Sequence, residues 1–146
     1  MIWNEASNVS QIERYPPIVL SVTDHRRLQV VAIEALLSDP RNAGALLDEL
    51  DRADIVEDAL LDARTVRLGD LVNYRDDASG EQHQVRLIDH VGQDADERDV
   101  SVLSSPGAAL VGLRVGQSIL WADRLGAERI YTILGVHRAG QWEAFS

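Results

Sequence analysis

The chain has 146 residues, of which 45% are hydrophobic, and it carries a formal net charge of −10. That length suits one or two small domains with enough apolar side chains for a core. The excess of acidic residues argues against tight nucleic-acid binding, which needs clustered cations to displace counterions from phosphates.

Two amino-acid types are absent, and their absence excludes several chemistries. There is no cysteine, so neither a disulfide framework nor a thiolate site is expected. All 14 basic residues are arginine, which excludes Schiff-base catalysis and a P-loop lysine. The sequence has no apolar run that predicts a membrane span and no signal-like N-terminus, so we expect a cytoplasmic protein.

The first region, residues 1–20, is a polar leader that we expect to be partly disordered. Its polar part ends in Pro16 and Pro17. The short apolar run at residues 18–20 predicts either an edge strand or a docking segment.

The second region, residues 21–62, has helical spacing of its apolar residues. Thr23 is placed to cap a first helix over residues 23–38. Asp39 and the proline after it break that helix, and a second helix is predicted over residues 43–61. Because the connection is short, the two helices are expected to form an antiparallel hairpin, a short coiled coil with an acidic outer face.

The third region, residues 63–146, changes to the alternating spacing of strands. Four or five antiparallel strands are predicted over residues 66–74, 82–91, 100–103, 118–121 and 129–136. One short helix interrupts them, which makes the chain an α+β protein.

The sequence predicts where the short helix begins and where it ends. Ser105 is a good N-cap, because its hydroxyl can accept a free N–H of the first turn. Pro106 then takes the first helical position, where its missing N–H costs nothing. Gly112 suits the left-handed residue after the helix, and Gly116 marks the turn into the next strand.

The string 104–117 resembles the signature of the C-terminal domain of the bacterial Gre transcript-cleavage factors and of their relatives, the nucleoside diphosphate kinase regulator (Rnk) family. Those proteins carry a Ser-Pro, a small helix and then Val-Gly-Asp or similar, where this chain has Gln117 in place of the acid. Residues 46–53 are similar to the Leu-Asp-Arg-Ala helix of Rnk. The resemblance covers residues 18–138 and implies an FKBP-like fold for the C-terminal region, residues 63–146.

The resemblance implies a regulator that binds RNA polymerase and is not an enzyme. It places Ser104, Ser105 and Pro106 in the loop through which Gre C-terminal domains grip the polymerase at its secondary-channel entrance, and Asp39 at the hairpin tip. The Gre tip motif is absent and the hairpin is far shorter, so we expect competition with Gre-type factors without cleavage. A monomer with no cofactor, no metal and no catalytic residue is expected.

Other interpretations stay open. Asp39 and Ser105 are good caps and need have no further role. A Gre-type transcript-cleavage factor is the first alternative function, with Asp39 as a magnesium-holding acid. An FKBP-like prolyl isomerase is the second; such a pocket needs several aromatics, and core or tail packing is the simpler role for Tyr74, Trp121, Tyr131, Trp142 and Phe145.

Two further residue groups are poor candidates for a metal site. The acidic loop of Asp94, Asp96, Glu97 and Asp99 lacks the glycine and spacing of an EF-hand, so we expect a solvated loop. His83 and His90 lie seven positions apart and would face opposite sides of an unbroken strand. The other two histidines are isolated in the sequence: His25 and His137.

Overall fold

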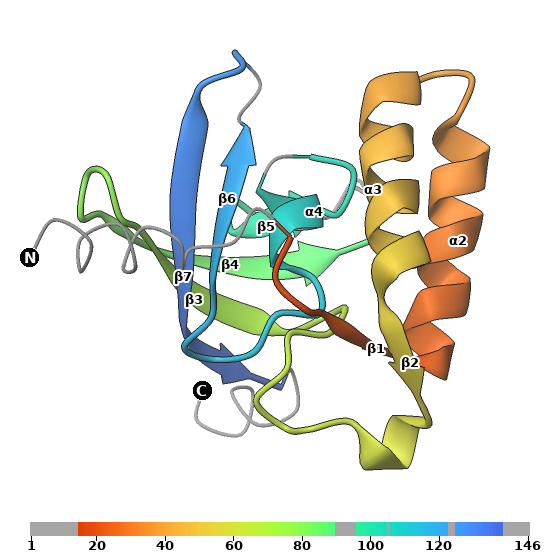
Figure 1. Ribbon diagram of the computed structural model, residues 1–146, viewed down its shortest axis with the longest axis horizontal. Coiled ribbons are helices and arrows are strands. Elements are labelled where there is room, and N and C mark those ends of the chain that lie inside the picture. The colour runs from red at the N-terminus through yellow and green to blue at the C-terminus, as the bar shows by residue number, and fades with distance from the viewer. Residues whose placement is uncertain (1–14, 90–95, 105, 123–124, 139–146) are drawn as a thin grey trace, which may run out of the picture.

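The computed structural model describes residues 15–89, 96–104, 106–122 and 125–138 (Figure 1). A pair of helices stands beside a curled sheet, with a short helix between them (Figure 1). Most of the expected polar leader, residues 1–14, lies outside the described part. The described residues contain no helix long and apolar enough to cross a membrane. In chain order the elements are β1 (Val19–Ser21), α2 (Val22–Ala35), α3 (Pro40–Arg52), β2 (Asp54–Val56), the 3₁₀-helix η1 (Asp58–Leu60), β3 (Leu71–Asp76), β4 (Gln82–Ile88), β5 (Asp99–Ser101), α4 (Gly107–Leu110), β6 (Ser118–Ala122) and β7 (Glu128–His137).

Strands β1 and β2, which directly precede α2 and follow α3, pair with each other. They run parallel, with Leu20 opposite Ile55, and α2 and α3 form the connection between them. Ser21 ends β1 and caps α2, because its hydroxyl accepts a hydrogen bond from the N–H of Asp24 at 3.0 Å. Two residues of the apolar run at 18–20, Val19 and Leu20, therefore lie in a strand, one of the two alternatives that the sequence left open.

The first helix differs from its prediction at both ends. Ser21, not Thr23, is its cap, and Thr23 donates from its N–H and its hydroxyl to the carboxylate of Asp58. The helix ends at Ala35 rather than near residue 38. The bond between Thr23 and Asp58 holds the start of α2 against η1.

The second helix is shorter than predicted. Asp39 occupies the cap position, as the sequence indicated, but the helix begins at Pro40 rather than at residue 43 and ends at Arg52 rather than at residue 61. The reason is strand pairing, because the N–H of Asp54 donates to the carbonyl oxygen of Ile18 at 3.0 Å. A partner that lies far away in the sequence therefore ends this helix.

The five-stranded sheet has the order β5-β4-β3-β7-β6. Neighbouring strands are antiparallel except β4 and β5, which are parallel, and this corrects the expectation of a wholly antiparallel sheet. Helices followed by a mostly antiparallel sheet with one short helix confirm the predicted α+β class.

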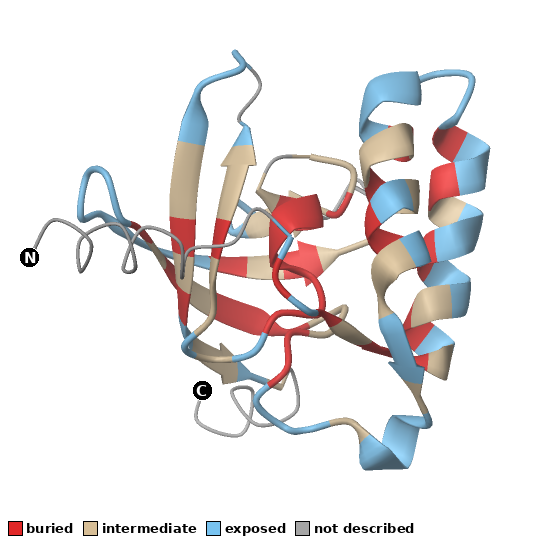
Figure 2. Ribbon diagram, in the orientation of Figure 1, coloured by how far each residue is buried: buried red, intermediate tan, exposed pale blue. Residues whose placement is uncertain are grey.

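One hydrophobic core runs through helices and sheet alike, as the buried residues in Figure 2 show. Fully buried members come from α2, α3, β3, β4 and α4: Leu28, Leu46, Val72, Leu87 and Leu110. The core crosses the boundary between the predicted hairpin, residues 21–62, and the predicted sheet domain, residues 63–146. The two regions therefore stabilise each other through shared apolar burial.

A close backbone contact joins β1 to the turn after α4. The N–H of Val19 donates to the carbonyl oxygen of Gly112 at 3.1 Å. Gly112 has a φ of +81°, which confirms its predicted left-handed conformation. A Cβ at this position would lie only 2.9 Å from the Cβ of Ile18, so only glycine allows β1 to pass this closely.

Two buried carboxyl groups fix the loop that precedes β3. Asp24 accepts from the N–H of Leu68 at 3.0 Å, and Asp70 accepts from the N–H of Arg67 at 2.8 Å and from the guanidinium of Arg138. Burial raises the pKa of Asp24 and raises the pKa of Asp70 to about 6. These bonds connect the start of α2, the sheet and the segment after β7.

We expect Gly112→Ala to destabilise the protein more than Gly116→Ala. Both glycines have a positive φ, +81° and +95°, so either change costs about 1 kcal/mol of left-handed strain. Only at Gly112 does the new Cβ meet a neighbour. Urea denaturation should show a loss of about 2–4 kcal/mol for Gly112→Ala and of about 1 kcal/mol for Gly116→Ala; equal losses would contradict the close contact with β1.

The pH dependence of stability should change in Asp70→Asn. The pKa of Asp70 is raised from 3.8 to about 6 by burial, so between these values the folded protein holds more protons than the unfolded chain. Stability from the protonated carboxyl is present at low pH and lost as the pH rises through about 6. From about pH 4 to about pH 7, urea titrations should show the wild type losing about 1–3 kcal/mol relative to Asp70→Asn. A constant difference between the two proteins would argue against this burial effect.

Candidate partner-binding site

The loop before α4 is held by its own backbone. Ser104 donates from its N–H and its hydroxyl to the carbonyl oxygen of Ser101, at 3.0 and 2.7 Å, and its own carbonyl accepts from the N–H of Ala108. Pro106 is the cap residue of α4 and not its first helical residue, which shifts the prediction by one position. Ser105, the predicted cap, lies outside the described residues.

Helix α4 is pressed directly onto the chain at β5. All four of its residues are buried, and a Cβ on Gly107 would lie 1.9 Å from the carbonyl oxygen of Ser101. This contact leaves no room for a side chain at the start of the helix. Ser104 and Pro106, which lie in the chain between the two residues of this packed contact, therefore have a firm support, which suits a contact surface.

Asp39 lies at the turn between α2 and α3. Its N–H donates to the carbonyl oxygen of Ala35 at 2.8 Å. Its carboxylate accepts from the side-chain amide of Asn42 at 3.0 Å and makes no capping bond to the backbone of α3. Asp39 thus occupies the predicted cap position, but its side chain is bound by Asn42, with the cation Arg41 also in the first turn.

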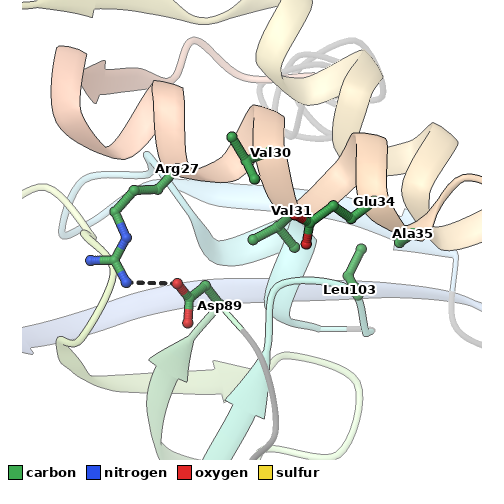
Figure 3. A pocket seen from close by; sticks show the side chains of 7 residues that line it. All are labelled: Arg27, Val30, Val31, Glu34, Ala35, Asp89 and Leu103. Carbon is green, nitrogen blue, oxygen red and sulfur yellow. Dashed lines mark hydrogen bonds and ion pairs between the residues drawn. The ribbon is translucent and has the colours of Figure 1, made fainter.

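A groove of about 480 Å³ lies between α2 and the segments that carry Asp89 and Leu103 (Figure 3). Leu103, the neighbour of Ser104, lines one side, and Ala35, four residues before Asp39, lines the other. An ion pair of 2.6 Å between Arg27 and Asp89 crosses its end. Residues that line the groove are therefore near neighbours in sequence of both predicted contact residues, Ser104 and Asp39.

The acidic loop forms no metal site among the residues that the structure describes. The guanidinium of Arg86 donates to both carboxylate oxygens of Asp99, at 2.7 and 2.9 Å. These hydrogen bonds hold the pKa of Asp99 below its usual value. The N–H of Asp96 donates to the same carboxylate at 2.8 Å. Asp99 therefore serves to join β5 to β4 and to shape the loop, while Asp94 lies outside the described residues.

The aromatic side chains of the sheet pack on one another. Tyr74 stacks on His83 with ring centres 5.2 Å apart and meets Tyr131 edge-to-face at 5.4 Å. Both tyrosines are buried, and burial raises the pKa of Tyr74 to about 12. These tyrosine rings contribute to the core, as the simpler interpretation expected. Three further residues named from the sequence lie outside the described part: His90, Trp142 and Phe145.

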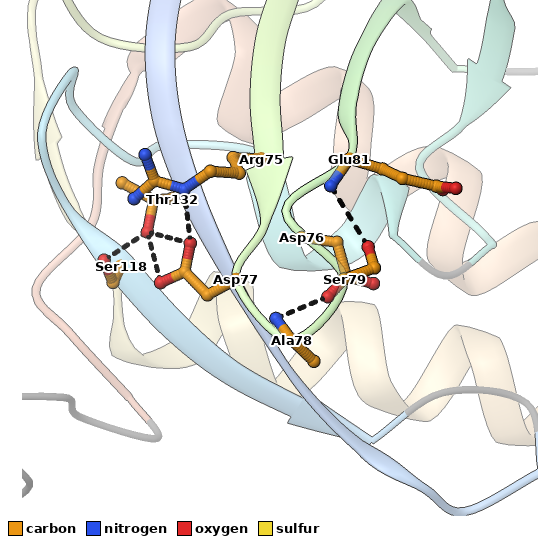
Figure 4. Close-up of polar contacts among 8 residues, drawn as sticks. All are labelled: Arg75, Asp76, Asp77, Ala78, Ser79, Glu81, Ser118 and Thr132. Atoms are coloured by element: carbon orange, nitrogen blue, oxygen red, sulfur yellow. Dashed lines mark hydrogen bonds and ion pairs between the residues drawn. The ribbon is translucent and has the colours of Figure 1, made fainter.

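A polar cluster at the end of β3 was not anticipated from the sequence (Figure 4). The hydroxyl of Thr132 lies 3.0 Å from a carboxylate oxygen of Asp77 and 2.6 Å from the hydroxyl of Ser118. Arg75 donates to Asp77 at 2.9 Å. The Asp77 carboxylate accepts from both Arg75 and Thr132, so we interpret the cluster as a cross-strand brace between β3, β7 and β6.

The groove was also missed, although the sequence held a signal for it. Val30 lines the groove. It belongs to an apolar set with Ile33 and with Leu37, just beyond α2, spaced by three and four and outside the stripe of Leu28 and Ala32 that enters the core. An apolar set on the solvent side of a helix indicates a contact surface. Leu103 could not have been assigned to it, because its position depends on the tertiary fold.

Two family models match consecutive parts of the chain. Residues 16–56 match the Rnk N-terminus. Residues 61–138 match the C-terminal domain of the transcription elongation factors GreA and GreB. The loop, α4 and the five-stranded sheet all fall within the second match, and β1, α2, α3 and β2 fall within the first.

Known proteins show the same relationship. The chain is 30% identical over 106 residues to the protein named Regulator of nucleoside diphosphate kinase from Escherichia coli (strain K12), which covers 73% of this chain and 78% of the relative. The protein of that name from Shigella flexneri matches to the same extent.

A solved structure supports the fold. The prokaryotic transcription elongation factor GreA/GreB from Nitrosomonas europaea superposes with a TM-score of 0.62 and 29% identity, over 83% of this chain and 98% of that chain. The mostly antiparallel sheet with one short helix thus matches the fold of the GreA/GreB C-terminal domain. Together these matches show that the chain belongs to the Rnk family of regulators, which joins an Rnk N-terminus to a Gre-type C-terminal domain.

Proposed function

We propose that this protein regulates transcription by binding RNA polymerase at the entrance of its secondary channel. It competes there with Gre-type factors and does not promote transcript cleavage. The observation that carries the proposal is the match of residues 61–138 to the GreA/GreB C-terminal domain, which contains the loop resembling a polymerase-gripping surface. Such a protein works in the cytoplasm, where the polymerase is.

The loop is suited to this role by its support. Ser104 is fixed by two hydrogen bonds to the carbonyl oxygen of Ser101, and Gly107 lies directly against the same carbonyl. Residues that are already fixed in the free protein, as Ser104 and Gly107 are, lose little conformational entropy on binding. In the proposed complex Ser104, Ser105 and Pro106 touch the polymerase.

The hairpin argues against a cleavage function. Helices α2 and α3 have 14 and 13 residues, so each arm is only about 20 Å long. Its tip has one carboxylate, Asp39, which is bound by Asn42 and followed by Arg41. Magnesium needs near-octahedral oxygen ligands, and this set is poor for that purpose. In the proposed complex Asp39 approaches the channel without holding a metal.

The acidic charge of the chain fits a protein partner better than nucleic acid. At a net charge of −10, phosphate backbones repel the protein at long range. We therefore propose contact with the polymerase itself and no tight binding of DNA or RNA. We propose that a single copy occupies each channel.

Ser104→Arg and Pro106→Ala should weaken binding to purified bacterial RNA polymerase, while Asp39→Ala should change it little. The arginine places a bulky charge on the proposed contact surface, and the alanine loosens the start of α4. We expect at least about a tenfold rise in Kd for Ser104→Arg, which corresponds to about 1.4 kcal/mol. The measurement is displacement of a labelled Gre factor from the polymerase.

The matched control is Ser79→Arg, which adds the same charge at an exposed turn between β3 and β4. All variants should keep the thermal midpoint of the wild type within a few degrees. Failure of the wild type to displace the Gre factor at micromolar concentration would refute the proposed function. Cleavage of backtracked RNA that is lost in Asp39→Ala would instead support the alternative of a Gre-type cleavage factor.

A further inference from the structure

The outer face of α2 carries three apolar side chains in water. Val30 is 54% exposed, Ile33 is 59% exposed and Leu37, just beyond the helix, is 99% exposed. Their spacing of three and four residues places them on one side of the helix. Leu28 and Ala32 enter the core from the other side, so this stripe has no covering partner among the described residues.

Two opposite charges flank the stripe. Arg27 and Glu34 are seven residues apart, two helical turns, and both line the groove beside Val30 (Figure 3). Glu34 is exposed and has no ion-pair partner in the described part of the chain. Arg27 pairs with Asp89, yet 56% of its side chain remains exposed. One edge of the stripe is therefore positive toward the start of α2 and negative toward its end.

We propose that this face pairs α2 with α2 of a second copy of the chain, in antiparallel orientation about a twofold axis at Val30. In this arrangement the two Val30 side chains meet at the centre. Each Glu34 comes within about one residue rise, 1.5 Å along the axis, of Arg27 on the other copy and on the same edge. The charge pattern is thus complementary to itself and forms two ion pairs at once.

The antiparallel orientation follows from the same charges. In a parallel pair, equal residues lie level, so Arg27 is level with Arg27 and Glu34 with Glu34, and neither charge is compensated. The contact also places the exposed Leu37 of each copy against the first turns of the other helix. Apolar burial supplies the attraction, while the ion pairs select the orientation.

The contact is small, so the association is weak. A helix of 14 residues is about 21 Å long, and one helix face on each copy gives an interface at the low end of specific ones, about 1,200 Å². We expect a Kd on the order of 10–100 micromolar. The pairing involves the free protein and does not depend on the proposed polymerase binding.

Analytical ultracentrifugation tests the proposal between about 5 and about 500 micromolar. The mass of the wild type should rise from 16.1 kDa toward twice that value. Val30→Glu should raise the Kd at least about tenfold. The matched control is Leu60→Glu, the same type of change at a side chain that is 74% exposed on η1, and it should associate like the wild type.

Charge reversal tests the orientation. Glu34→Arg and Arg27→Glu should each weaken association, whereas the protein that carries both changes should regain it, because the two ion pairs form again with reversed signs. Thermal midpoints check that each variant is folded, since Arg27→Glu also removes the pair with Asp89. A wild type that stays at 16.1 kDa throughout, association unaffected by Val30→Glu, or a double variant no better than the single ones would overturn the proposal.

Discussion

The arrangement of this protein depends on how closely β1 passes the turn after α4. Gly112 accepts the N–H of Val19 and leaves the space that the Ile18 side chain fills. The carbonyl of Ile18 in turn accepts from Asp54. One strand thus contacts the helical unit on one side and the Gre-type domain on the other. Because the contact is made by backbone groups, it fixes the position of the helices without relying on any single large side chain.

Two buried acidic residues also join the helices to the sheet. Asp24 and Asp70 bind neighbouring N–H groups of the loop before β3, so the first turn of α2 is fixed to the sheet. With one face held in this way, the opposite face of α2 stays in water and exposes Val30 and Ile33. The same constraint that stabilises the fold therefore creates the apolar surface from which self-association is inferred.

Local signals predicted local features well. The left-handed Gly112, the cap position of Asp39 and the change from helical to alternating spacing all came from residues close together in the chain. Features that depend on distant partners were missed. The second helix ends at Arg52 because β2 pairs with β1, and β5 pairs with β4 in parallel rather than antiparallel orientation. Of the candidate site, the sequence indicated the loop but not the residues that support it. Glycine is required at position 107 because the carbonyl oxygen of Ser101, in β5, packs against it, and this contact depends on the tertiary fold.

The central claim is that the supported loop at the start of α4 is where this regulator meets RNA polymerase. Amide hydrogen exchange, measured on the protein alone and in excess polymerase, tests it most directly because it reports each segment separately. Binding should slow exchange in residues 101–110 and leave the exposed turn at residues 77–81 unchanged. Unchanged exchange in 101–110 under conditions where the protein is bound, or protection confined to the turn, would contradict the account.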